Sequence, residues 1–147
     1  MRMDPGVRFE ILWNDADLFE VRVSAWNGVF GGSADVYVGI GGLVKSAHDL
    51  EGFPQNPSDK RKLQFGEFGF RSTGGAATID FYCNDSAGHA LVEVRIESDH
   101  AGRAPAQSVF LAAAVEPAAV DSFVSDLRRL EKDQRRTAFL STSRSSA

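Results

Sequence analysis

Cysteine, excess positive charge and long apolar runs are all scarce in this chain of 147 residues. A single cysteine, Cys83, excludes an intramolecular disulfide. A chain of this length buries roughly 68–70% of its unfolded surface, so its core needs no disulfide or metal to hold it together. No apolar run approaches the roughly 20 residues of a membrane-spanning helix. Because the first residues also have no apolar signal-peptide core, we expect a cytoplasmic protein.

The charge balance excludes two further kinds of partner. Lysine and arginine number 16 against 20 acidic residues, which leaves a net charge of −4. Nucleic acids and anionic membrane surfaces are bound by a concentrated positive field, which this composition does not supply. We therefore expect no nucleic acid and no membrane as partner, whereas a protein with a basic surface remains compatible.

Motifs of catalysis and of cofactor binding are also missing. The three histidines, His48, His89 and His100, are not paired with cysteine or with each other at metal-ligand spacing. There is no Gly-x-Ser-x-Gly elbow and no Walker loop. The glycine-rich segment 28–33 lies between two predicted strands, so it has no helix N-terminus to hold a phosphate. The sequence thus predicts no metal, no cofactor and no enzymatic activity.

What the chain does contain is periodicity. Apolar and charged residues alternate in several segments, as in half-buried strands, and two segments have apolar residues at helical spacing. Glycine and asparagine punctuate the connections. The predicted strands are 7–13, 18–26, 34–39, 61–70, 76–83, 90–98, 107–115 and 137–140, and the predicted helices are 43–50 and 117–130. The strand at 107–115 is apolar without alternation, which favours a central strand covered on both faces.

The order strand-strand-strand-helix-strand occurs twice. Segment 14–23 is echoed by segment 84–96, and segment 35–38 by segment 108–111. Hairpins dominate, so we expect an α+β fold with a mostly antiparallel sheet, two helices and a possible internal duplication of a βββαβ unit. Residues 1–140 form one predicted domain. The serine-rich residues 141–147 form a predicted disordered tail.

Two aromatic residues fall on the charged side of their strands. Trp26 has the parity of Glu20 and Arg22, and Tyr37 lies between Val36 and Val38. Such residues either lie under a helix or loop or anchor a partner from an outward face. We take Trp26 and Tyr37 as candidate partner-binding residues, with Asp35 beside them.

A second candidate site lies in one hairpin turn, and a further tryptophan is assigned to the core. Asp85 and His89 are close in sequence and can act as a general base with its orienting carboxylate. They can equally stabilise a polar turn, which is the interpretation that we favour because no nucleophile or oxyanion motif accompanies them. Trp13, at the end of the first strand, is expected in the core.

Several short motifs resemble one family, the small bacterial immunity proteins of the WapI-like kind and related bacterial domains. They are Phe30 with Gly32, Leu43 with Leu50, Gly88-His89, and Phe123 with Leu127. The resemblance spans about Phe9 to Leu130. The chain departs from the family in its long loop at 52–60 and its serine-rich tail. The resemblance implies a non-enzymatic protein that binds and neutralises a cognate toxin.

These observations leave three hypotheses. The first is a cytosolic, non-catalytic domain that binds a protein partner, immunity-like in its role. The second is a small enzyme that uses Asp85 and His89. The third is a ligand-binding or self-associating structural domain. A deep pocket at His89 favours the enzyme, whereas a broad exposed patch at Trp26 and Tyr37 favours partner binding.

Overall fold

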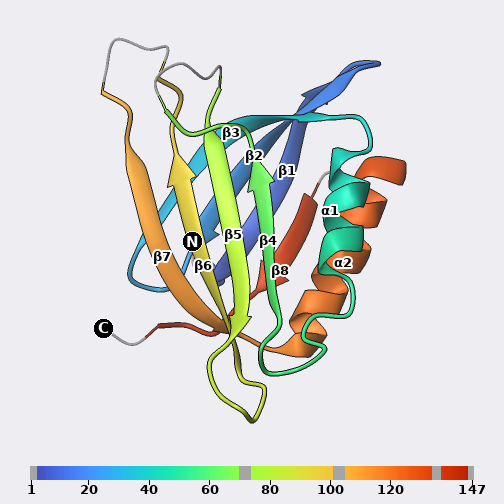
Figure 1. The fold of residues 1–147 in the computed structure, drawn as a ribbon. Helices are drawn as coiled ribbons and strands as arrows, with labels where there is room; N and C mark the ends of the chain where they lie inside the picture. Colours follow the sequence, from blue (N-terminus) through green and yellow to red (C-terminus); the bar gives the residue numbers. More distant parts are fainter. Residues whose placement is uncertain (1–2, 70–73, 101–104, 134–136, 146–147) are drawn as a thin grey trace.

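The computed structural model describes residues 3–69, 74–100, 105–133 and 137–145. These residues form an α+β fold with two helices and two four-stranded sheets. In chain order the elements are β1 (Gly6–Asn14), β2 (Leu18–Trp26), β3 (Gly31–Gly39), α1 (Gly42–Leu50), β4 (Lys60–Phe65), β5 (Ala76–Cys83), β6 (Ala90–Glu97), β7 (Ser108–Val115), α2 (Pro117–Lys132) and β8 (Thr137–Ser141). Figure 1 shows one sheet in front of the other, with both helices along one side.

Every strand pair is antiparallel, as the sequence predicts. One sheet has the order β3-β2-β1-β8 and the other β4-β5-β6-β7. Each sheet therefore consists of three consecutive strands and a fourth from the other half of the chain. The element order is βββαβ followed by βββαβ, in agreement with the predicted order, while duplication as its origin stays a prediction.

The core lies between the two sheets. The inward residues of β2 are those that alternation predicts: Phe19, Val21, Val23 and Ala25, all buried. At its centre Phe9 contacts Phe65 and Phe123 edge to face, with ring centroids 5.1 and 5.5 Å apart. This geometry is the favoured one for aromatic pairs.

The two helices close the side of the molecule between β4 and β8 (Figure 1). They pack against each other, α1 also against β4 and α2 also against β8. The predicted apolar stripe of α2 is fully directed into the core: Val120, Phe123, Val124, Leu127 and Leu130 are buried. None of the helices in the described part of the chain is long and apolar enough to cross a membrane.

The sequence predicts a central position for β7, but this strand is the last of its sheet. Its side chains alternate between buried and exposed, and Phe110 is 60% exposed. The alternation is hidden in the sequence because Ala112 and Ala114 occupy outward positions, where small apolar side chains face water at little cost.

Trp13 was also expected in the core and is 45% exposed instead. The register of β1 against β2 shifts between Ile11 and Trp13, and this bulge turns the indole to the outer face opposite Glu20. Bulges change side-chain parity, so simple alternation assigns the wrong face beyond them.

The C-terminal residues follow a defined path up to residue 145, where the sequence predicts disorder. Ser141 is the last residue of β8. The backbone amides of Thr142, Ser143 and Ser145 then donate hydrogen bonds to Pro5, Ala114 and Asn27. Residues 146 and 147 of the predicted tail, and residue 70 of the strand predicted at 61–70, lie outside the described residues.

Candidate functional site

The three candidate residues of the first site share the outer face of the sheet β3-β2-β1-β8. In the strand register, Glu20 lies opposite Tyr37, Arg22 opposite Asp35, and Trp26 opposite Gly31. Directly opposed residues point to the same side of a sheet, so this face carries charged and aromatic side chains together.

Asp35 and Tyr37 line a hollow of about 420 Å³ at the edge of this sheet. We call it the Tyr37 hollow, and its lining comprises Glu20, Arg22, Ser33, Ala34, Asp35, Tyr37, Gly74, Ser98 and Asp99. Strands β2 and β3 form its floor, and residues beside β5 and β6 form its rim. Acidic groups outnumber the single arginine in the lining, so the hollow suits a positively charged group.

Asp35 is held in a fixed position by Arg22. The guanidinium donates from Nε to Oδ1 at 2.8 Å and from Nη2 to Oδ2 at 3.2 Å. This hydrogen bonding is the main reason that the pKa of Arg22 is raised. Since both side chains are more than a third exposed, we assign the pair a role in orienting the carboxylate rather than a large contribution to stability.

Tyr37 forms one wall of the hollow and is 41% exposed. The negative charge of Glu20 is the main cause of the raised pKa of its phenol, followed by desolvation. Gly74 lies under the ring, since a Cβ there would come within 3.0 Å of Tyr37 Cδ2 and Cε2. Gly75 N–H donates to the Asp35 carbonyl at 2.8 Å, which fastens this segment to β3. The contact with Gly74 and the hydrogen bond from Gly75 to β3 thus fix the position of the Tyr37 ring.

Trp26 does not join this hollow. It lies six residues from Glu20 along β2, which corresponds to roughly 20 Å. It is half-buried and borders a separate hollow of about 230 Å³ with Arg8, Ser24 and Phe139 among its neighbours. The structure therefore brings Asp35 and Tyr37 together and leaves Trp26 at the other end of the same face.

The aromatic residue that does share a row with Tyr37 is Trp13. Register pairs Trp13 with Glu20 and Glu20 with Tyr37, so the glutamate lies between the two aromatic residues. With strands spaced about 4.8 Å, the two backbone positions are about 10 Å apart. Sequence reasoning missed Trp13 because of the bulge before it. The adjacent turn residues Asn14 to Asp17 mark the end of the strand but not the shift.

The structure also brings the alternative pair together. His89 Nδ1 lies 2.6 Å from Asp85 Oδ2, and the side chains are 76% and 45% exposed. This hydrogen bond raises the pKa of His89 and lowers that of Asp85. Asp85 Oδ1 also accepts the backbone N–H groups of Ala87 and His89. These are the bonds of an Asx turn, and they fit a role in shaping the tip of the β5–β6 hairpin.

Metal-binding geometry is not found in the described ranges, where no group of three or more His, Cys, Asp or Glu could hold an ion. Cys83 is half-buried and packs against the core. Comparison of the chain with protein-family models, with curated proteins and with solved structures finds no match.

Proposed function

We propose that this protein is a non-catalytic domain that binds a protein partner through the Tyr37 hollow and the neighbouring Trp13, and that its role is immunity-like, the neutralisation of a toxin. The observation that carries the proposal is the row Trp13, Glu20, Tyr37 on an outer sheet face. Two aromatic side chains, 45% and 41% exposed, flank one carboxylate there. Tryptophan and tyrosine are enriched among the residues that dominate binding energies.

Preorganisation supports this use of the surface. Tyr37 is backed by Gly74, and Asp35 is oriented by Arg22. Side chains already fixed in the free protein lose little conformational entropy on binding. The partner that suits this surface presents a basic side chain to the hollow and an apolar contact to the aromatic rings. In such complexes rim charges mainly set the association rate, and buried aromatic groups set the lifetime.

The test uses the protein encoded by the gene adjacent to this one, co-expressed and co-purified with it. Substitution of Tyr37 by alanine should weaken the complex about 30-fold, which corresponds to about 2 kcal/mol, as for a hot-spot residue. Asp35→Ala should mainly slow association at low salt. Surface plasmon resonance at two ionic strengths measures both effects.

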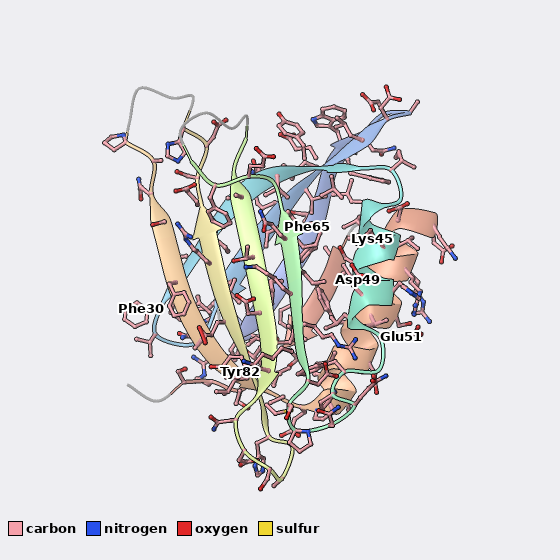
Figure 2. All side chains as sticks on the ribbon, viewed as in Figure 1. Phe30, Lys45, Asp49, Glu51, Phe65 and Tyr82 are labelled. Atoms are coloured by element: carbon pink, nitrogen blue, oxygen red, sulfur yellow. The ribbon has the colours of Figure 1, made fainter. Side chains whose placement is uncertain are left out.

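Phe30→Ala is the matched control. Phe30 is an aromatic residue, 60% exposed, on the turn between β2 and β3, beside β7 and outside the Tyr37 hollow (Figure 2). Its removal should leave the affinity unchanged. Equal losses for Phe30→Ala and Tyr37→Ala, or no complex at all, would count against the proposal.

A further inference from the structure

The row Trp13, Glu20 and Tyr37 places one carboxylate between two exposed aromatic side chains. Glu20 on β2 lies opposite Trp13 of β1 on one side and opposite Tyr37 of β3 on the other. Strands are spaced about 4.8 Å apart, so a group above Glu20 stands about 5 Å from the strand position of each aromatic residue. A cation is attracted to an aromatic face within roughly 6 Å of the ring centroid. The spacing of the row therefore suits a cation seated between the two aromatic side chains.

Glu20 supplies the negative charge of this row, and no cation of the described residues forms an ion pair with it. The residue is half-buried on the outer face of the sheet. The ion pairs of the described ranges do not include it. Arg22, two residues along β2, donates to both oxygens of Asp35 instead. Because a partly buried charge is stabilised by an opposite charge beside it, Glu20 is a ready acceptor for an incoming positive group.

The adjoining Tyr37 hollow carries charge of the same sign. Glu20, Asp35 and Asp99 line it together with one base, Arg22, among the described residues. Since Arg22 is held by Asp35, it does not offer its charge to a ligand. The volume of about 420 Å³ lies within the roughly 300–1,000 Å³ of ligand pockets. An anion is repelled here, whereas a cation is attracted by both the row and the hollow.

The arrangement of the carboxylates discriminates between the two basic side chains. Arginine gains most from a carboxylate that it meets with two parallel hydrogen bonds, and Asp35 already makes that pair with Arg22. Glu20 stands beside the Tyr37 phenol, whose pKa its charge raises. Lysine carries a compact point charge on a flexible stem of four carbons, and this stem packs on apolar surface while the ammonium group meets a charge. A lysine therefore needs a single carboxylate, which Glu20 supplies.

We propose that Trp13, Glu20 and Tyr37 form the binding site for the ammonium group of a lysine side chain, whose stem enters by the Tyr37 hollow. The inference rests on the proposed function, because it names the group of the protein partner that the site receives. The Glu20 carboxylate is the counter-ion, and the two rings contribute cation–π attraction and apolar contact with the methylene groups. Arg22 keeps Asp35 occupied, so Glu20 is the carboxylate that the cation meets.

The test uses the full chain and Nα-acetyl-lysine methylamide as the probe, with Nα-acetyl-arginine methylamide for comparison. The chain has two tryptophans, so its ¹H–¹⁵N spectrum contains two indole N–H signals. Trp13 lies in the row, and Trp26, roughly 20 Å from Glu20 along β2, is an internal control. The lysine compound should shift the Trp13 signal saturably in the millimolar range, leave the Trp26 signal unchanged, and bind more tightly than the arginine compound.

Substitutions separate the charge from the aromatic contacts. Glu20→Gln keeps the shape and removes the charge, so it should weaken binding of the lysine compound about fivefold. Glu10→Gln is the matched control and should leave the affinity unchanged, since Glu10 is likewise half-buried on the outer face but lies opposite Arg22. Trp13→Ala, followed at the Tyr37 amide, should weaken binding about two- to fivefold, as for the loss of one exposed cation–π contact.

Three results overturn the inference: no saturable shift at Trp13, an arginine compound that binds as tightly as the lysine compound, or equal losses for Glu20→Gln and Glu10→Gln. The protein partner is tested separately. A complex with the product of the adjacent gene that Tyr37→Ala weakens, together with no binding of the lysine compound, supports the proposed function and removes the ammonium site. Binding of the lysine compound without any complex retains the site as a receptor for an amine and removes the protein partner.

Discussion

At the scale of single residues, the most heavily bonded side chain of the described residues outside the core is Arg61. It donates to both carboxylate oxygens of Asp59 at 2.8 and 2.9 Å. Its Nη1 also donates to the carbonyls of Asp49 and Glu51, at 2.9 and 3.1 Å, where α1 ends. The side chains of Arg61 and Asp59 are 19% and 11% exposed. Arg61, on β4, thus links Asp59 in the preceding loop to the end of α1. Bidentate arginine–carboxylate pairs of this kind are among the stronger hydrogen-bonded pairs.

This pair predicts an acid-dependent loss of stability. The hydrogen bond from Arg61 lowers the folded-state pKa of Asp59 below its ordinary value of 3.8. The contribution of Asp59 is therefore complete above the ordinary pKa and is lost as the pH falls through the lowered one. Asp59→Asn should reduce the free energy of unfolding at pH 7, and its difference from the unaltered protein should shrink toward pH 2.

Urea unfolding at a series of pH values measures this difference. Asp121→Asn removes the same charge from an exposed position on α2 and is the control. If the Asp59→Asn and unaltered curves run parallel down to pH 2, the pair is not the source of the acid sensitivity.

Core residues of α2 give a simpler prediction. Phe123 and Leu127 are fully buried, and Phe123 contacts Phe9 edge to face. Truncation to alanine should cost about 3–5 kcal/mol for Phe123 and about 2–5 kcal/mol for Leu127, because both leave cavities. Shifts of the urea midpoint measure these losses. Unchanged midpoints would show that the stripe does not stabilise the core.

Alternation in the sequence predicted the face of most strand residues but not their neighbours. It placed Asp35 and Tyr37 on the outer face, where the structure has them. It could not tell that Trp26 is far from Tyr37, because the register between β2 and β3 determines which residue of β2 lies opposite Tyr37. It assigned Trp13 to the core because the bulge in β1 depends on pairing with β2 and leaves no mark in residue type.

At the scale of elements, α1 depends on a residue from α2 for its N-terminus. Gly41 at the N-cap has φ +88° and no side chain to accept the free amides. The Glu131 carboxylate supplies the acceptors instead. Its Oε2 accepts a hydrogen bond from Gly41 N–H at 2.7 Å, and its Oε1 accepts hydrogen bonds from Leu43 and Val44 N–H at 3.1 and 3.3 Å. A carboxylate there also interacts favourably with the helix dipole. This cap was not predictable from local sequence, because it comes from a distant helix.

Removal of the cap should therefore destabilise the packing of both helices. Glu131→Ala should cost about 0.5–2 kcal/mol, in the range of lost N-caps. Glu131→Gln should cost less, since the amide oxygen still accepts a hydrogen bond. Thermal unfolding followed by circular dichroism measures both. Glu116→Ala is the charge-matched control, as Glu116 makes no side-chain cap bond on α2. An equal loss for Glu116→Ala would contradict a capping role for Glu131.

Strand β7 illustrates why an element's position is harder to predict than its existence. The segment was correctly predicted as a strand from its apolar residues. Its central place was wrong, because alanines read as apolar in sequence yet lie outward on an edge. Whether a strand has one neighbour or two depends on the remaining chain, not on its own composition.

At the scale of the whole molecule, the two halves of the chain each complete the other's sheet. Strand β4 pairs with β5 of the second half, and β8 pairs with β1 of the first. Helices α1 and α2, one from each half, pack together beside these closing strands. The sequence predicted two similar βββαβ units. It did not predict that their last strands change places, since residue patterns determine which face is buried and not which strand is adjacent.

This arrangement predicts that neither half folds alone and that the two halves fold together. A fragment of residues 1–69 leaves β4 without a partner strand and β1 without β8, and residues 70–147 lose the corresponding pairs. Fragments of this size are marginal even with a complete core, because they bury only about 60% of their surface. Each fragment should give the circular dichroism of an unfolded chain. An equimolar mixture should regain strand signal and one cooperative thermal transition, and its ¹H–¹⁵N spectrum should match that of the intact protein. Native-like dispersion in either fragment alone would mean that the exchange of closing strands is not required for stability, and that each βββαβ unit is a folding unit in itself.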